Sequence, residues 1–263
     1  TIRHLLTHTA GFRNVLGVQW HKEPWADIIF KTCGTFLEPG WTPGAKAGYH
    51  PASSWFILAE IACRRKKRPF SQIVRQDILD PLNLNDTHLG MLPEQYRAYG
   101  DRIGQMHNAH RVYAHLDTEE GATLCRPGGG ARGPIRELGH FYEALLNDGS
   151  PILEPETVVA FTRCQRKDMF DHTFQHVIDW GLGFITNSNH HGPDTVPYNF
   201  GHHASPTTFG HGGIQSSTAF ADPEHNLVVA LVCNGMPGEA QHNQRARALH
   251  TAIYEDLGLD NSN

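Results

Sequence analysis

The order of apolar patterns along the 263 residues predicts an α+β fold. Helical spacing dominates up to about residue 176, whereas the segment from residue 177 contains strand-like runs and glycine turns before one last helical pattern. Helices and antiparallel hairpins that are separated in this way are typical of α+β proteins. We therefore expect a mostly helical domain over residues 1–176 and an α/β domain over residues 177–263.

Helical spacing recurs several times in the first half of the chain. A first short helix is expected over residues 2–8, where Gly11 follows its apolar positions. Pro51 and Pro134 suit the first turns of two further helices, and Gly149 suits the end of the second. The remaining helical patterns cover residues 23–32, 70–80 and 153–163. Residues 90–127 are polar with little periodicity, which predicts loops.

Strand patterns dominate the second half. "WGLGFIT" predicts one strand, and residues 209–233 predict two strands around the turn "DPEHN". The second of these, "LVVALVC", is apolar on both faces, which predicts a central strand of the sheet. An amphipathic helix is expected over residues 239–258.

Composition excludes some classes of protein. A net charge of −5 argues against nucleic-acid binding, and the basic run Arg64–Arg68 is expected to end a helix. No apolar run has the length of a membrane span. Five cysteines without a C-x-x-C pair indicate reduced thiols, so we expect a cytoplasmic protein.

Three short segments could carry chemistry. In "TIRHLLTHTAGF", His4 and His8 are four residues apart but lack the Glu of a zinc-binding H-E-x-x-H helix, which favours a structural part. In "GYHPASS", Tyr49 leaves a loop at a helix start, where a phenol can act as a general base or pack as a half-buried ring. In "FGHGGIQSS", glycines flank His211 and allow close approach to the backbone, whose N–H groups can stabilise an oxyanion.

The nineteen histidines raise the alternative of a His-dependent metal protein. The adjacent pairs His190–His191 and His202–His203 are expected to point apart, so they predict no shared metal site. We expect neither a metal nor a cofactor.

Taken together, the segments resemble the serine β-lactamase and penicillin-binding-protein-like family, in particular its class C β-lactamases and family VIII carboxylesterases. "RHLLTHTAGF" resembles the family's R-H-L-L-T-H-T-S-G segment, and "GYHPASSWFILAEI" its Y-S-N segment with the following helix. "GGGARGPIRELGHFYEALLNDG", "WGLGF" and "GHGGIQSSTAFADPEHNLVVALVCN" resemble three further family segments, in the family's order. The resemblance implies a β-lactamase/transpeptidase-like fold and acyl transfer through a serine nucleophile.

The resemblance also implies roles for residues. Tyr49 matches the family's catalytic Tyr, and His211, Gly212 and Gly213 stand where the family has K-T-G or H-x-G. The N–H of Ile214 is then the expected oxyanion donor, and His50 and Gly212 are expected to contact the substrate.

Two departures favour esters over β-lactams. Pro51 replaces the Asn of Y-x-N and has no amide side chain for a substrate, and His211 replaces the charged Lys of K-T-G. We therefore expect a small-molecule ester or amide as substrate.

The nucleophile is the largest departure. No Ser has a Lys three residues later, so the family's S-x-x-K motif does not occur in the chain. The family keeps this motif, its helix and the N-terminal strands before the R-H-L-L-T-H segment. We expect the Ser and Lys to precede Thr1 and residues 1–263 alone to be inactive. A non-catalytic binding or scaffold protein of the same fold is the alternative.

Overall fold

The structure is a computed structural model that describes residues 1–108 and 118–260. It divides into two compact units, of which the first contains Thr1–Gln105 and Val112–Pro134 and the second Met106–Arg111 and Ile135–Asn263. This division differs from the boundary at residues 176 and 177 that the sequence suggested. The reason is that the helix that follows Pro134 packs on strands of the sheet, as described below.

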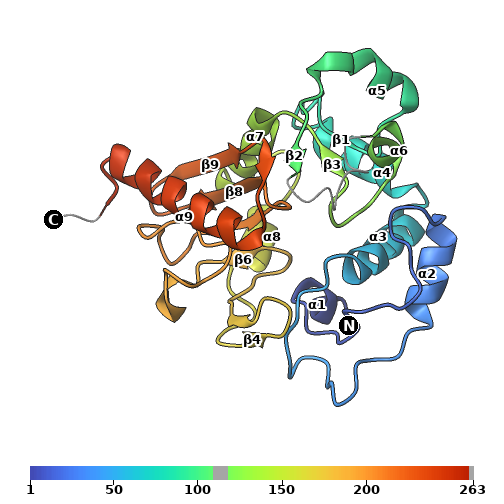
Figure 1. Cartoon of the computed structure of the whole chain (residues 1–263), viewed down its shortest axis with the longest axis horizontal. Coiled ribbons are helices and arrows are strands. Elements are labelled where there is room, and N and C mark those ends of the chain that lie inside the picture. Colours follow the sequence, from blue (N-terminus) through green and yellow to red (C-terminus); the bar gives the residue numbers. More distant parts are fainter. Residues whose placement is uncertain (109–117, 261–263) are drawn as a thin grey trace. The chain divides into compact units, whose positions relative to one another are not determined.

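The first unit is mostly helical (Figure 1). Its helices are α1 (Ile2–Leu6), α2 (Trp25–Cys33), α3 (Ser53–Lys66), α4 (Phe70–Val74), the π-helical η1 (Arg75–Leu79), α5 (Pro93–Tyr99), the 3₁₀ turn η2 (Gly100–Arg102) and α6 (Glu119–Thr123). Strands β1 (His88–Leu89) and β3 (Ala131–Arg132) form a short antiparallel pair.

Helix α3 forms the centre of the first unit because its apolar face packs on α2. Phe56 joins Ile28 and Ile29 of α2 in one buried cluster. The helix ends where Lys67 adopts a left-handed conformation and its N–H bonds to the Cys63 carbonyl at 2.7 Å. Arg64 to Lys66 occupy the last turn, as the sequence predicted, where positive charge complements the helix dipole.

The second unit combines helices with a sheet. Its elements are β2 (His107–Asn108), α7 (Ile135–Leu146), α8 (Pro155–Thr162), β4 (Phe170–Asp171), β5 (His176–Val177), β6 (Ile185–Thr186), the 3₁₀ turn η4 (Asn189–His191), β7 (Phe209–Gly212), β8 (Ser217–Asp222), β9 (Leu227–Val232), β10 (Gly235–Met236) and α9 (Glu239–Asp256). The main sheet has the order β6-β7-β8-β9 and is antiparallel throughout. Among the described residues, β4 pairs with β5 and β2 with β10.

Strand β8 is buried on both faces because a helix covers each side of the sheet (Figure 1). Ala219 and Ala221 point into a cluster with α7 residues. The alternate residue Phe220 stacks on Tyr254 of α9, and Thr218 bonds to His250 of the same helix. This two-residue alternation is that of a strand between two layers, and the predicted α+β class is confirmed.

Three details of the predicted strands were wrong. "FGHGGIQSSTAFAD" is a hairpin of β7 and β8 rather than one strand, since Gly213 bonds to the Ser217 carbonyl and Gln215 has a positive φ of 48°. β6 is confined to Ile185–Thr186, after a turn at Gly183 with φ 94°. Within the described residues β9 is an outer strand, and its apolar character on both faces reflects the two helical layers rather than a central position.

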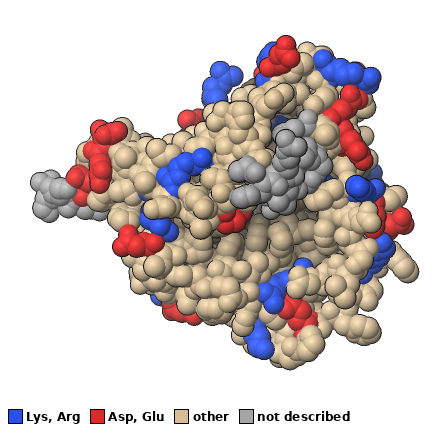
Figure 2. Space-filling model, viewed as in Figure 1, with Lys and Arg blue, Asp and Glu red and all other residues tan. Residues whose placement is uncertain are grey.

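The described surface carries charges of both signs. Figure 2 shows basic and acidic side chains interspersed over the visible face. All five cysteines are free thiols. None of the described helices combines the length and the apolar character that crossing a membrane requires.

Candidate active site

Tyr49 is half-buried in the first unit, and hydrogen bonds to His8 hold both of its chain neighbours. The Gly48 N–H donates to the His8 carbonyl at 2.9 Å, and the His50 N–H donates to His8 Nδ1 at 3.2 Å. The Tyr49 ring meets the His8 ring edge to face, with centroids 4.7 Å apart. His8 therefore fixes the backbone and the ring of the predicted catalytic Tyr.

His8 can do this because it stands just after α1 in a left-handed conformation, with φ 54°. Such a conformation is uncommon for a residue other than glycine. It turns the chain so that the imidazole is fully buried against Tyr49 and Trp55. These contacts agree with the structural role that the sequence predicted for His8. The contact between His8 and Tyr49 was not visible in the sequence.

His50 completes a reciprocal arrangement. Its Nε2 accepts hydrogen bonds from the N–H groups of Gly11 and Phe12, at 3.2 and 3.1 Å. An imidazole nitrogen that accepts two donors carries no proton, so the proton of the neutral ring is on Nδ1. The side chain is fully buried. Contact between His50 and a substrate stays a prediction. The observed hydrogen bonds show that the ring holds the backbone at Gly11 and Phe12.

Gly11 has to be a glycine in this arrangement. Its φ is 91°, and a Cβ would lie 2.2 Å from the Trp41 ring. Trp41 in turn donates from Nε1 to the Thr9 carbonyl at 3.1 Å. The segment before Tyr49 is thereby packed against the segment after α1, which explains why both sequence patterns occur together.

In the second unit, His211 lies on β7, with its ring enclosed beside the Trp180 ring at a centroid distance of 5.7 Å. Nδ1 donates to the Gly212 carbonyl at 2.7 Å. Burial lowers the pKa of His211 below its ordinary value of 6.5, although the bond to Gly212 acts in the opposite direction. The imidazole is therefore neutral at pH 7.

The two glycines after His211 are required by close neighbours. A Cβ on Gly212 would lie 2.3 Å from the Tyr198 ring, and one on Gly213 would lie 2.3 Å from Ser217 Oγ. Gly213 also donates to the Ser217 carbonyl at 2.6 Å, which closes the hairpin. Both glycines thus have a packing reason, and a role of Gly212 or Gly213 toward a substrate stays a prediction.

Ile214 lies at the tip of this hairpin with an exposed side chain. Within residues 1–108 and 118–260, no acceptor takes a hydrogen bond from its N–H. The preceding residue, Gly213, donates its N–H to the Ser217 carbonyl. The first N–H of the turn without an acceptor among the described residues is therefore that of Ile214. A backbone N–H with no internal partner is what an oxyanion site requires.

The predicted site residues fall into two groups. His211, Gly212, Gly213 and Ile214 are consecutive on β7 and its turn, whereas Tyr49 and His50 belong to the first unit. Each group has the local geometry described above.

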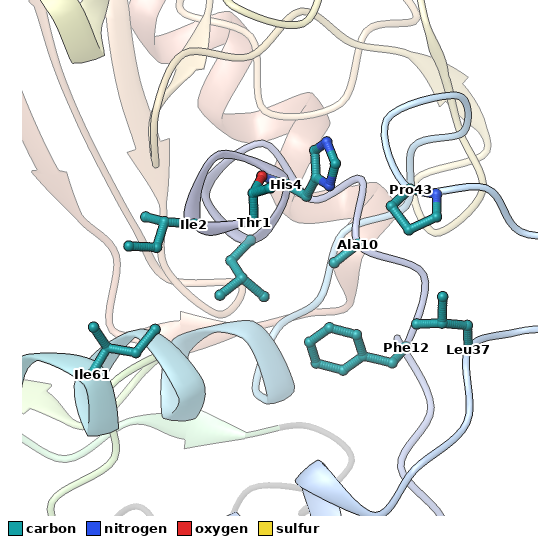
Figure 3. A pocket seen from close by; sticks show the side chains of 9 residues that line it. Thr1, Ile2, His4, Ala10, Phe12, Leu37, Pro43 and Ile61 are labelled. Carbon is teal, nitrogen blue, oxygen red and sulfur yellow. The ribbon is translucent and has the colours of Figure 1, made fainter.

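A pocket of about 460 Å³ lies within the first unit and contains none of the predicted site residues. Figure 3 shows its lining side chains, which come from α1, from α3 and from the segments that follow α1 and α2. They are Thr1, Ile2, His4, Leu5, Ala10, Phe12, Leu37, Pro43 and Ile61. The lining is mostly apolar and offers His4 as its one titratable ring, so we place no chemistry there.

The expectation that His190 and His191 point apart was wrong. Their ring centroids are 3.8 Å apart, because the residues lie in the 3₁₀ turn η4 rather than in a strand. Successive side chains of a 3₁₀ turn are separated by about a third of a turn and not by half a turn. His202 and His203, by contrast, approach different carboxylates, those of Asp194 and Glu255.

The sequence pattern of the family described as Beta-lactamase matches residues 1–252. The chain belongs to the beta-lactamase family. Among curated proteins, it is 26% identical over 212 residues to a putative D-alanyl-D-alanine carboxypeptidase of Escherichia coli O157:H7, covering 73% of this chain and 46% of that protein. It is 23% identical over 272 residues to the esterase/beta-lactamase LipL of Mycobacterium tuberculosis, covering 89% and 58% of the two chains. Both names describe hydrolases.

A solved structure shows the same fold. The penicillin-binding protein homolog from Caulobacter crescentus superposes with a TM-score of 0.71 at 23% sequence identity, covering 95% of this chain and 70% of that one. The chain spans about half the length of the curated relatives it matches. The family match over residues 1–252 confirms the membership that the sequence motifs predicted, and the structural likeness confirms the predicted β-lactamase/transpeptidase-like fold.

Proposed function

We propose that this chain contributes the general base and one oxyanion donor to a serine hydrolase that cleaves small-molecule esters through an acyl-enzyme. The observation that carries the proposal is the Ile214 N–H, which has no acceptor among the described residues. The nucleophilic Ser and its Lys come from outside residues 1–263, since no S-x-x-K motif occurs in them. The second oxyanion donor is the N–H of that Ser.

Tyr49 takes the proton of the attacking Ser in this proposal. A phenol has an ordinary pKa of about 10, so it needs a nearby cation to act as a base at neutral pH. The Lys of S-x-x-K supplies that cation. The two hydrogen bonds from the neighbours of Tyr49 to His8 support this role, because a general base has to be held within hydrogen-bond reach of its proton.

His211 favours a neutral ester over a β-lactam. A β-lactam carries a carboxylate, and the Lys of K-T-G offers it a permanent charge. The lowered pKa of His211 leaves a neutral ring at pH 7, which gives little attraction to such a carboxylate. Pro51 in place of Asn removes an amide that would bind the substrate's own amide group.

Hydrolysis of p-nitrophenyl esters tests the proposal. We expect no turnover by residues 1–263 alone, and turnover once the coding sequence that precedes Thr1 is added. In the extended protein, Ile214→Pro removes the N–H and should lower kcat by roughly 10²–10³-fold, as loss of an oxyanion donor does. Ile214→Val keeps the N–H and is the matched control.

A second pair of variants separates the general base from packing. Tyr49→Phe should lower kcat by roughly 10²–10⁴-fold, whereas Tyr96→Phe in the same unit should leave it unchanged. An extended protein that hydrolyses no ester and reacts with no serine-directed probe would instead support the non-catalytic scaffold. Turnover by residues 1–263 that survives Tyr49→Phe would reveal a nucleophile inside the chain.

A further inference from the structure

Four side chains of the second unit converge on one point outside the predicted active-site residues. They are Asp168, Asp179, His190 and His191, and one potential ligand atom from each lies within 4.8 Å of all the others. Asp168 and Asp179 flank the hairpin of β4 and β5, and the histidines belong to η4. Residues more than ten positions apart in the chain therefore present two carboxylates and two imidazoles to a common centre.

The nitrogen-to-oxygen distances in this cluster are longer than those of charge-assisted hydrogen bonds. His190 Nε2 lies 3.6 Å from Asp168 Oδ1 and 3.4 Å from Asp179 Oδ2. His191 Nε2 lies 3.4 Å from Asp168 Oδ1 and 3.2 Å from Asp179 Oδ1. Of these contacts, the 3.2 Å contact is the one with hydrogen-bond geometry. Hydrogen bonds between an imidazolium and a carboxylate are shorter, about 2.7–2.9 Å.

The same distances fit the edges of a metal-ligand tetrahedron. Zinc binds imidazole nitrogen and carboxylate oxygen at about 2.0–2.2 Å, so neighbouring ligands of a tetrahedral site are about 3.3–3.6 Å apart. With Oδ1 taken from each carboxylate, the nitrogen-to-oxygen separations of 3.2, 3.4 and 3.6 Å are close to that range, and all four ligand atoms lie within 4.8 Å of one another.

We propose that Asp168, Asp179, His190 and His191 bind a divalent transition metal, with zinc as the best match. Two carboxylates and two neutral imidazoles carry a net charge of −2, which a divalent cation neutralises. Imidazole nitrogen together with carboxylate oxygen is a donor set that zinc accepts in tetrahedral geometry. Since the protein supplies all four ligands, no position remains open for water, and the site is structural rather than catalytic.

Asp179 is the anchor of this site. Its side chain is 4% exposed, so its carboxylate is almost entirely removed from water. Its Oδ1 accepts the Asp168 N–H at 2.8 Å, and its own N–H donates to Ser188 Oγ at 2.9 Å. A buried carboxylate is costly unless opposite charge compensates it, and a metal ion supplies that charge.

Contacts outside the ligands hold both segments in place. The Asn189 N–H donates to Asn187 Oδ1 at 2.8 Å, which fixes the start of η4. Across the hairpin, Arg166 and Asp171 form a buried ion pair of 3.0 Å, with both side chains almost fully buried. These contacts fix the backbone segments on which the ligands lie. The metal would join the hairpin of β4 and β5 to η4, independently of ester hydrolysis.

Zinc binding to purified, metal-free residues 1–263 tests the proposal. We expect one zinc per chain by calorimetry, a higher Tm with zinc present, and a tetrahedral ligand-field spectrum when Co²⁺ replaces zinc. His190→Gln should raise the zinc Kd by at least the 10–100-fold that loss of an outer-shell contact already costs. The His190 side chain is half exposed, so the His190→Gln substitution leaves no buried cavity. Asp179→Asn should abolish the stoichiometric site.

The double variant His202→Gln/His203→Gln is the matched control. It removes another adjacent pair, which approaches two different carboxylates, and should leave the Kd for zinc unchanged. The proposal is overturned if zinc does not saturate at one equivalent. It is also overturned if His190→Gln binds zinc as the unchanged chain does, or if the control variant loses the metal.

Discussion

The His50 N–H donates a hydrogen bond of 3.2 Å to Nδ1 of His8, across more than forty residues of sequence. The His8 carbonyl accepts from Gly48 at 2.9 Å, so the two bonds bracket Tyr49. His8 thus connects the segment after α1 with the residue that we propose as general base, through backbone geometry rather than through chemistry of its own.

Replacing His8 tests this connection. His8→Ala leaves the buried His50 N–H without its acceptor and should lower the free energy of unfolding by about 1–3 kcal/mol. His8→Asn should recover much of the loss, because the Asn side-chain oxygen can accept the bond and Asn tolerates positive φ. His4→Ala, on the partly exposed neighbouring histidine, should change stability little. Urea denaturation measures all three, and equal effects of His4→Ala and His8→Ala would contradict the assignment.

Gly210 allows β7 to approach β8. A Cβ on Gly210 would lie 2.4 Å from the Ala219 carbonyl oxygen, which belongs to the backbone and cannot rotate away. Gly210→Ala should therefore cost about 1–3 kcal/mol of stability, as overpacking of a core does. Gly129→Ala is the control, because nothing lies within 4 Å of its Cβ position. A Gly210→Ala variant with an unchanged denaturation midpoint would show that the strands can separate without cost.

His250 should make the protein less stable in mild acid. Its Nε2 bonds to Thr218 Oγ1 at 2.7 Å, and its Nδ1 donates to the Asn199 carbonyl at 3.2 Å. Burial lowers the pKa of His250 from 6.5 to about 4, which the bond to Asn199 offsets only in part. The folded protein keeps the ring neutral where the unfolded chain takes up a proton. Stability is therefore complete above pH 6.5 and is lost as the pH falls toward 4.

The size of this loss follows from the two pKa values. Between pH 7 and pH 5, His250 alone should remove about 2 kcal/mol of unfolding free energy. Thermal denaturation at both pH values measures the total loss, which His250→Gln should reduce and His140→Gln, on an exposed ring, should not. NMR titration of the histidine rings gives a direct check. A His250 ring that titrates near pH 6.5 would contradict the prediction.

The sequence predicted the elements and the family because both depend on local pattern. Helix α3 and strands β8 and β9 follow from apolar spacing, and the five segments in the family's order identify the family. The hairpin turn at 213–216 was missed because Gly-Ile-Gln-Ser contains no Asn-Gly or Asp-Gly pair, while the turn depends on one left-handed residue, Gln215.

The proposed metal cluster was missed for a different reason. Asp168 and Asp179 become neighbours of η4 only through the hairpin of β4 and β5. The one local sign is the polar run "NSNHH", whose Asn187 fixes the turn that brings the two histidine rings together. No periodic sequence pattern indicates that separate segments come together in this way.

The central claim is that the attacking Ser lies outside residues 1–263 and works with Tyr49. The most direct test is to label the protein, extended by the coding sequence before Thr1, with a fluorophosphonate and to map the adduct by peptide mass spectrometry. We predict one labelled Ser outside Thr1–Asn263, in an S-x-x-K motif, with labelling slowed by Tyr49→Phe and not by Tyr96→Phe. An adduct on a Ser within residues 1–263, such as the buried Ser53 or Ser54 at the start of α3, would contradict the claim.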